Sequence, residues 1–409
     1  MKNLKIIHLS ESDITGGSAY YAYRISKFMN EQKKIKSKMY VLTKNSQDKN
    51  IVKFTSNGIS KFWKKFYYFL LKENNKYSFY NYGNYVIKNY SQISDIIREK
   101  PNALIIYNNS NFIHPKIISF LSSKNIKVIF YLMDMELITG GCHYNFKCNG
   151  YKNNCQICPA TGVILKNLPQ KILNEKKKYF YEKKINFISP NSVTYNDVSK
   201  SSIFNKKLHI NHKLFLGLNL RTYKPKKMKK TDDKIIISMR SSLNPRKGNH
   251  LLIDALNYLS VRKKNLNKKI FFNIVGDSNI TNFLKKKKFN FRFTPYIKNE
   301  KQLVKFYQES DFFLNQSIQD LGPFMVNESL ACGIPVLSFK IGIAKDIIKS
   351  GYNGFILKKI SSKLLANELI KLSTLNKTKL KIIKNNSRNT AMKYFDIKKQ
   401  VQKILQISK

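Results

Sequence analysis

The feature that most constrains the fold is a regular alternation, along the whole chain, of short apolar runs with segments of helix length. Apolar runs typical of buried strands lie at residues 5–9, 38–42, 103–107, 127–132, 185–189, 234–239, 270–275, 291–294, 312–315 and 335–339. Short apolar strands that alternate with helices form parallel sheets with helices packed on their faces. The pattern therefore predicts an α/β protein built on parallel sheets.

One polar segment interrupts this alternation. Residues 224–230 (KPKKMKK) lack apolar periodicity and indicate a linker. With 409 residues, 42% of them hydrophobic, the chain is long enough for two cores. We expect two Rossmann-like domains with a ligand cleft between them. The predicted boundaries are an N-terminal domain at 1–223, a linker at 224–231, a C-terminal domain at 232–390 and a last helix at 391–409 that returns to the first domain.

The charge balance is strongly basic, with 75 Lys and Arg against 24 Asp and Glu, a net charge of +51. The lysine codons of an AT-rich genome, an anionic membrane surface and nucleic acid are the three explanations to weigh. Only eight of the basic residues are arginine. Sequence-specific nucleic-acid proteins favour arginine for its bidentate fork, so nucleic acid is not an expected partner.

Residues 59–72 (ISKFWKKFYYFLLK) form a basic, aromatic segment. At helical spacing Ile59, Phe62 and Trp63 share one face, which suits either a membrane interface or packing on a sheet. No apolar run reaches the roughly 18–20 residues of a membrane span. The start MKNLKIIHLS predicts a first strand rather than a secretory signal. We expect a cytoplasmic protein, peripheral at the inner face of the membrane.

The segment 317–339 (SIQDLGPFMVNESLACGIPVLSF) carries the strongest indication of chemistry. Asp320 lies in a loop and Glu328 lies eight positions later in the following helix. The first amides of a helix lack partners and carry partial positive charge, so such a turn can hold anionic or hydroxyl-rich groups. Carboxylates accept hydrogen bonds from sugar hydroxyls. The spacing alone is equally compatible with Asp320 as a helix cap and Glu328 as a solvated residue.

This segment resembles the acidic E-x7-E motif of the retaining glycosyltransferases of family 4, which have the two-domain GT-B fold. The later sequences CGIPV (332–336) and GYNG (351–354) resemble the continuation of that motif. The resemblance implies that Glu328 binds the ribose of a sugar nucleotide and that Asp320 contacts the donor sugar. It also implies that the main chain of four residues holds the sugar and the phosphates: Leu321, Gly322, Pro323 and Phe324.

Other segments extend the resemblance. Residues 240–248 (RSSLNPRKG) follow a predicted strand, and clustered cations there suit a pyrophosphate. The resemblance implies that Arg240 and Lys247 grip the donor diphosphate, with a slightly longer spacing between them than is usual. It also implies donor contacts from Gly276, Ile297, Gly16 and Gly17; the last two form a loop between the first strand and the first helix, where Gly allows close approach of the backbone.

Four cysteines, Cys142, Cys148, Cys155 and Cys158, form a C-x5-C-x6-C-x2-C pattern in an insertion at 139–160. Four thiolates can make a closed tetrahedral zinc site, with His143 as a weaker ligand. Stable disulfides are not expected without a secretory signal. Free thiols and an iron–sulfur cluster or redox pair are the alternatives.

The pattern TGGCHY…C…CxxCP also resembles a subgroup of family 4 that acts in colanic acid, capsule and other exopolysaccharide synthesis. In that subgroup a His usually precedes Asp134 and points at the donor sugar. Here Met133 holds that position, and Met can neither donate a hydrogen bond nor carry charge. Asp134 remains a candidate polar contact to the donor.

The resemblance implies a retaining hexosyltransferase that moves a sugar from a nucleotide donor to a hydroxyl of a lipid-linked glycan in bacterial surface polysaccharide synthesis. Catalysis would require no cofactor or metal, and any zinc at the cysteines would be structural. Three alternatives remain: a sugar-nucleotide-binding or scaffold protein of the same fold without turnover, a basic nucleic-acid-binding protein, and a GT-B sugar-nucleotide epimerase.

Overall fold

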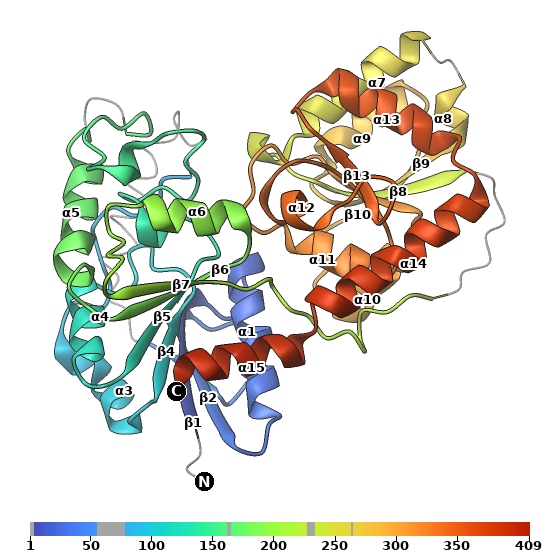
Figure 1. Ribbon diagram of the computed structural model, residues 1–409. Coiled ribbons are helices and arrows are strands. Elements are labelled where there is room, and N and C mark those ends of the chain that lie inside the picture. Colours follow the sequence, from blue (N-terminus) through green and yellow to red (C-terminus); the bar gives the residue numbers. More distant parts are fainter. Residues whose placement is uncertain (1–3, 55–77, 162–164, 227–233, 263–264) are drawn as a thin grey trace. The chain divides into compact units, whose positions relative to one another are not determined.

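The computed structural model describes residues 4–54, 78–161, 165–226, 234–262 and 265–409. The chain divides into two compact units (Figure 1). Unit 1 comprises Met1–Leu214 and Lys399–Lys409, and unit 2 comprises Phe215–Lys398. The basic aromatic segment 59–72 and most of the predicted linker lie outside the described residues.

Unit 1 is built on a parallel sheet of seven strands among the described residues, in the order β3-β2-β1-β4-β5-β6-β7. The strands are β1 (Leu4–Ser12), β2 (Ile35–Thr43), β3 (Ile51–Lys53), β4 (Ala103–Ile106), β5 (Lys127–Tyr131), β6 (Ile185–Ser189) and β7 (His209–Lys213). Its α-helices are α1 (Gly17–Asn30), α3 (Ser94–Glu99), α4 (Pro115–Ser122), α5 (Leu168–Phe180) and α6 (Ser192–Lys200). The interior strand β1 pairs in parallel with β2 and β4, with Ile6 opposite Ser37 on one side and Ala103 on the other.

The C-terminal helix α15 (Ile397–Ser408) contributes to unit 1 from Lys399 onward. Its Gln400 side chain donates a hydrogen bond of 2.7 Å to the hydroxyl of Tyr131, at the end of β5. Both residues are buried, so the last helix is tied by a specific polar contact as well as by apolar packing.

Unit 2 is built on a second parallel sheet, with six strands among the described residues in the order β10-β9-β8-β11-β12-β13. These are β8 (Ile235–Ser241), β9 (Ile270–Gly276), β10 (Asn290–Thr294), β11 (Phe312–Asn315), β12 (Val336–Phe339) and β13 (Gly354–Leu357). The helices are α7 (Asn249–Arg262), α8 (Leu266–Lys269), α9 (Thr281–Lys286), α10 (Glu300–Gln308), α11 (Phe324–Ala331), α12 (Gly342–Ile347), α13 (Ser362–Ser373) and α14 (Lys377–Tyr394). The predicted α/β class with parallel sheets is confirmed.

The central strands of unit 2 are buried and largely apolar because both faces of the sheet are covered. In β11, Phe312 and Leu314 belong to one hydrophobic cluster and the intervening Phe313 belongs to another. Successive side chains of a strand point to opposite faces, so each cluster lies on its own side of the sheet. Figure 1 shows α7 and α13 over one face and α10, α11 and α14 over the other.

The doubly covered sheet leaves the loops at the carboxyl ends of its strands as the place for polar chemistry. In open α/β sheets, ligands bind beyond these carboxyl ends. The sequence RSSLNPRKG begins with the last two residues of β8 and continues through the loop after it, and the loop after β11 contains Asp320. Because β8 and β11 are neighbours in the sheet, the two loops leave the same edge side by side.

Candidate functional site

The centre of the candidate site in unit 2 is the carboxylate of Asp320, which two cations contact. Its Oδ2 accepts hydrogen bonds from Lys247 Nζ at 2.5 Å and from Arg246 Nη1 at 3.1 Å. Arg246 Nη1 also donates to the carbonyl of Gln319 at 2.7 Å. Lys247 and Asp320, both predicted, are thus brought together across 73 positions of sequence. Arg246 was not selected from the sequence, although it stands next to Lys247 in the quoted loop.

The positive charges of Lys247 and Arg246 favour the ionised form of Asp320. Burial alone would raise the pKa of Asp320, but the charges of Lys247 and Arg246 lower it to about 2. Burial lowers the pKa of Lys247, and the positive charges of Arg246 and Arg240 act in the same direction, against the attraction of Asp320. At neutral pH this predicts an ionised Asp320 that can only accept hydrogen bonds.

The charge of Arg240 lowers the pKa of Lys247, and its guanidinium group also faces an aromatic ring. Its guanidinium carbon stands 5.9 Å from the ring centre of Tyr296, which is exposed. The three cations Arg240, Arg246 and Lys247 outnumber the single carboxylate of Asp320. A cluster with such a surplus of positive charge suits an anionic ligand, and guanidinium groups suit phosphate in particular.

Local geometry explains why the loop carries a Lys-Gly pair. The side chain of Asn244 accepts a hydrogen bond from the Arg246 amide and starts a short 3-10 turn, Pro245–Lys247. Gly248 follows with φ of 73°, and a Cβ there would lie 2.0 Å from the carbonyl oxygen of Gln316. Only glycine fits this close approach. The loop after β8 is therefore pressed against the end of β11, which places Lys247 beside Asp320.

Helix α11 begins just after Asp320. Pro323 is its N-cap residue and makes no side-chain capping hydrogen bond. Leu321 is buried, whereas Gly322 and Phe324 are half-buried. The start of the helix therefore adds partial positive charge to the same loop that carries Asp320.

Glu328, on α11, is held in a way that the sequence did not reveal. Its Oε1 accepts a hydrogen bond of 3.1 Å from the hydroxyl of Tyr223, and its Oε2 accepts one of 2.8 Å from Tyr307. All three side chains are buried. The ribose-binding role of Glu328 stays a prediction, and the two tyrosines are new members of its surroundings.

The other predicted donor contacts lie at loop positions. Gly276 ends β9 with φ of 115°, and Ile297 is half-buried in the loop after β10. In unit 1, Gly16 precedes α1 with φ of 85°. No atom lies within 4 Å of where a Cβ of Gly16 or Gly17 would stand, so the main chain at this helix start faces open space.

In unit 1, Asp134 is the acidic end of a three-residue chain of contacts. Its Oδ2 lies 2.9 Å from His143 Nδ1, and His143 Nε2 lies 2.7 Å from Ser110 Oγ. Burial is the largest single influence and lowers the pKa of His143, but the charge and hydrogen bond of Asp134, together with the charges of Glu136 and Glu11, raise it overall. The imidazole that Asp134 contacts therefore comes from position 143, while Met133 is half-buried beside it in sequence. Both ring nitrogens of His143 are engaged.

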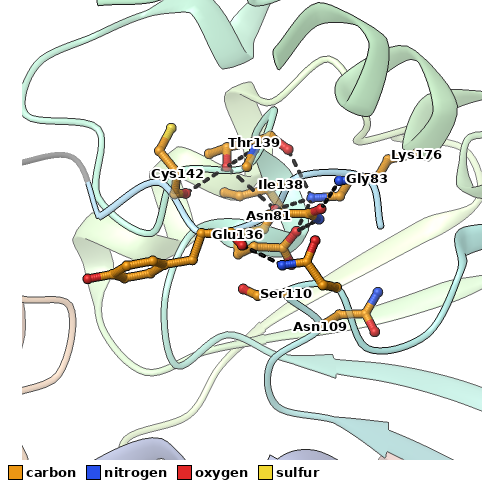
Figure 2. A network of polar contacts seen from close by, with 12 residues as sticks. Asn81, Gly83, Asn109, Ser110, Glu136, Ile138, Thr139, Cys142 and Lys176 are labelled. Atoms are coloured by element: carbon orange, nitrogen blue, oxygen red, sulfur yellow. Dashed lines mark hydrogen bonds and ion pairs between the residues drawn. The ribbon is translucent and has the colours of Figure 1, made fainter. Parts of the chain in front are cut away.

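Two residues after Asp134, a buried ion pair anchors the start of the cysteine-rich insertion (Figure 2). Lys176 Nζ, on α5, lies 2.5 Å from Glu136 Oε1 and donates to the carbonyl of Thr139 at 3.0 Å. Asn81 Nδ2 donates to the same Glu136 oxygen, and Thr139 Oγ1 donates to the Cys142 carbonyl at 2.7 Å. Lys176 and Glu136 are fully buried. This network fixes the main chain immediately before the first cysteine.

The four cysteines of the insertion line one cavity, together with Asn145, Gly150, Tyr151, Ile157 and Pro169. Burial raises the pKa of Cys155 to about 11 and also raises that of Cys142 and Cys158, and the neighbouring sulfurs add to each shift. All four are free cysteines. Among the described residues, no three His, Cys, Asp or Glu side chains already stand in an arrangement that holds a metal ion.

Comparisons with known proteins bear on the fold and on the family of the second half of the chain. Residues 221–389 match the family described as Glycosyl transferases group 1, a range that contains Arg240, Lys247, Asp320 and Glu328. A glycosyltransferase from Rickettsia africae is similar in structure over 100% of this chain and 98% of its own, with a TM-score of 0.69 and 15% identity. The fold is that of the GT-B glycosyltransferases.

Two further glycosyltransferase structures are similar to the whole chain. Anabaena HepE in complex with UDP-glucose matches with a TM-score of 0.64 and 14% identity, and covers 98% of each chain. WaaG, a glycosyltransferase involved in lipopolysaccharide biosynthesis, matches with a TM-score of 0.68 and 14% identity, covering 98% of this chain and 99% of its own. No curated protein matches the chain.

Proposed function

We propose that this chain is a retaining glycosyltransferase that moves a hexose or related sugar from a nucleotide donor to a hydroxyl of a glycan. The observation that carries the proposal is the surplus of cations around Asp320 at the start of α11, inside the range that matches the group 1 family. The complex of HepE with UDP-glucose makes UDP-sugars the first donors to test.

The proposed mechanism follows from the charges. Breaking the bond between the anomeric carbon and the phosphate oxygen leaves negative charge on the departing diphosphate. Lys247, Arg240 and the first amides of α11 stabilise that charge most strongly as it develops, which lowers the barrier. Arg246 joins them as a second cation on Asp320. No step of this sequence needs a metal ion.

The two acids take different parts in this proposal. Asp320, ionised because its pKa is about 2, accepts hydrogen bonds from hydroxyls of the donor sugar. Glu328 accepts hydrogen bonds from the ribose, with its carboxylate held in place by Tyr223 and Tyr307. In unit 1, Gly16, Gly17 and Asp134 are the proposed contacts to the phosphates and the sugar.

A thermal-shift screen with UDP-sugars and other sugar nucleotides tests the binding site. A ligand that binds only the folded protein raises the melting temperature in proportion to the logarithm of its concentration. We expect this response in the wild type and a clearly weaker one in Glu328→Ala. Glu368→Ala, on α13, is the matched control and should respond like the wild type. Equal responses in Glu328→Ala and the wild type would contradict the site assignment.

The proposed acceptor is a lipid-linked glycan at the inner face of the bacterial membrane, in the synthesis of a surface polysaccharide. The net charge of +51 and the role of the similar WaaG support it. Among the described residues, no helix combines the length and apolar character of a membrane span. Trp63 is the only tryptophan in the chain, so its fluorescence reports on residues 59–72 directly. Anionic vesicles should shift its emission and neutral vesicles should not; no change with either would rule out this mode of docking.

The alternative is a sugar-nucleotide-binding protein without turnover. It is favoured by Met133, whose thioether cannot replace the usual His as a hydrogen-bond donor. Donor hydrolysis and sugar transfer by the purified protein separate the two functions. Binding of a UDP-sugar with neither reaction would establish the alternative, and transfer to a glycan would exclude it.

A further inference from the structure

The cysteine cavity of unit 1 is a second site of distinct chemistry, separate from the cations and acids of unit 2. Cys142, Cys148, Cys155 and Cys158 come from three turns of an irregular insertion and line the same cavity. The cavity has about 10 Å³ of internal room, close to what one water-sized sphere needs.

The four thiols are the ligands at this cavity that zinc prefers, and the side chain of Asn145 also lines it. His143, next to Cys142, has both ring nitrogens engaged by Asp134 and Ser110. Glu136 is committed to Lys176. The remaining wall of the cavity contributes Ile157, Pro169 and Tyr151 side chains, and the Tyr151 hydroxyl donates to Asp197.

The backbone of the insertion is unusual for a segment with so little core of its own. Phe146, Lys147 and Cys155 have φ values of 41°, 72° and 53°, in the left-handed region that non-glycine residues rarely adopt. Each such residue costs of the order of 1–3 kcal/mol and persists only where its surroundings impose it. The buried apolar residues of this region are few: Phe79, Tyr82, Ala160 and Ile172. So few apolar contacts hold these three residues only weakly in the left-handed conformation.

We propose that the four thiolates of Cys142, Cys148, Cys155 and Cys158 bind one zinc ion, which holds the insertion in its folded form. Zinc favours closed tetrahedral sites of four thiolates, and the ion would displace the four thiol protons to solvent. Because no ready-made group of ligands exists among the described residues, the sulfurs must turn toward a common centre.

Metal content of the purified full-length protein tests the proposal. Elemental analysis should find about one zinc per chain in the wild type. Cys155→Ser and Cys158→Ser should each lower the zinc content at least fivefold. Cys332→Ser is the matched control, because Cys332 is equally a buried free cysteine but lies in unit 2. It should keep the wild-type zinc content.

A second measurement keeps the test valid where a variant fails to fold. Cobalt exchanged into the wild-type protein should give sulfur-to-cobalt charge-transfer absorption and the intense visible bands of a tetrahedral thiolate site. A thiol-modifying mercurial should then release the metal together with that absorption. Cobalt bands typical of nitrogen and oxygen ligands would overturn the four-sulfur site.

The other uses of the cysteines are distinct outcomes of the same experiments. If the analysis finds iron and acid-labile sulfide instead of zinc, the cysteines bind an iron–sulfur cluster. A mass decrease on non-reducing analysis would indicate disulfides, and a metal-free protein with five reactive thiols after denaturation would indicate free thiols. Each of these results overturns the proposal. None of the readouts depends on sugar transfer, so failure here leaves the proposed function untouched.

Discussion

Two lysine–carboxylate pairs, one in each unit, have the same N–O distance of 2.5 Å and opposite surroundings. Lys176 and Glu136 in unit 1 are fully buried, whereas the Lys247 and Asp320 side chains in unit 2 are 18% and 10% exposed. Around Glu136, one cation meets one acid, and Asn81 and main-chain carbonyls complete the network. Around Asp320, a second cation shares the same oxygen.

The difference teaches how to separate a structural ion pair from a binding one. A buried pair without access to solvent must balance its own charge, because an uncompensated ion in the interior is costly. A partly exposed group with surplus cations has unused attraction for an anion from solution. By this criterion Lys176 stabilises the fold, and Lys247 is available to a ligand.

The largest expected effect is on stability at the buried pair. Lys176→Met should lower the free energy of unfolding by about 3–5 kcal/mol, because it leaves the Glu136 carboxylate buried without a cation. Chemical denaturation measures this. Lys178→Met, at an exposed position of the same helix, should change it by less than about 0.5 kcal/mol. The double variant Glu136→Gln/Lys176→Met should recover part of the loss, and a strictly additive result would show that the two residues do not interact.

The next largest effect is on the catalytic activity, at the partly exposed pair of Lys247 and Asp320. Lys247→Met should lower kcat/KM for sugar transfer by about 10²–10³, the cost of removing a charge from a developing oxyanion. Its free energy of unfolding should change little, since Arg246 still neutralises Asp320. Lys286→Met, an exposed residue of α9, serves as the activity control. A Lys247→Met protein that unfolds easily but stays active would reverse the assignment of the two pairs.

Acid should weaken the Asp320 pair before the molecule loses its other contacts. The folded-state pKa is about 2 against an ordinary 3.8, so the ionised acid stabilises the fold fully above about pH 4 and not at all below pH 2. The free energy of unfolding of the wild type should therefore exceed that of Asp320→Asn by about 2 kcal/mol near neutral pH. Denaturant titrations from pH 2 to 5 should show this gap closing as pH falls, and a gap independent of pH would contradict the cause.

The smallest effect concerns Glu328, an acid whose recorded partners are phenols. Tyr307→Phe removes one hydrogen bond to a charged group and should cost about 1.5 kcal/mol of stability. If Glu328 binds ribose, the same variant should raise KM for the donor more than it lowers kcat. Tyr352→Phe, at an exposed position, is the control. Unchanged stability and KM in both Tyr307→Phe and Tyr223→Phe would show that the phenols do not position Glu328.

Much of the fold was predictable because its signal is local. Residues 312–314 are apolar at every position, and β11 is buried on both faces as that pattern requires. The Lys-Gly pair at 247–248 was also readable, since a glycine after a cation marks a tight turn near charge. The choice between Arg240 and Arg246 was not readable, because both belong to one short basic segment. Only the structure shows that Arg240 stays in β8, whereas the turn from Pro245 to Lys247 brings Arg246 to Asp320.

The sequence by itself determined the parallel α/β class, the loops that carry the chemistry and the cysteine pattern, because each depends on residues close together in the chain. Only the tertiary structure decided the partners of the acids: two phenols for Glu328, two cations for Asp320 and one buried lysine for Glu136. These partners lie between 21 and 105 positions away. A local sequence pattern cannot indicate partners at such separations, because side chains that far apart in the chain meet only when strands and helices pack.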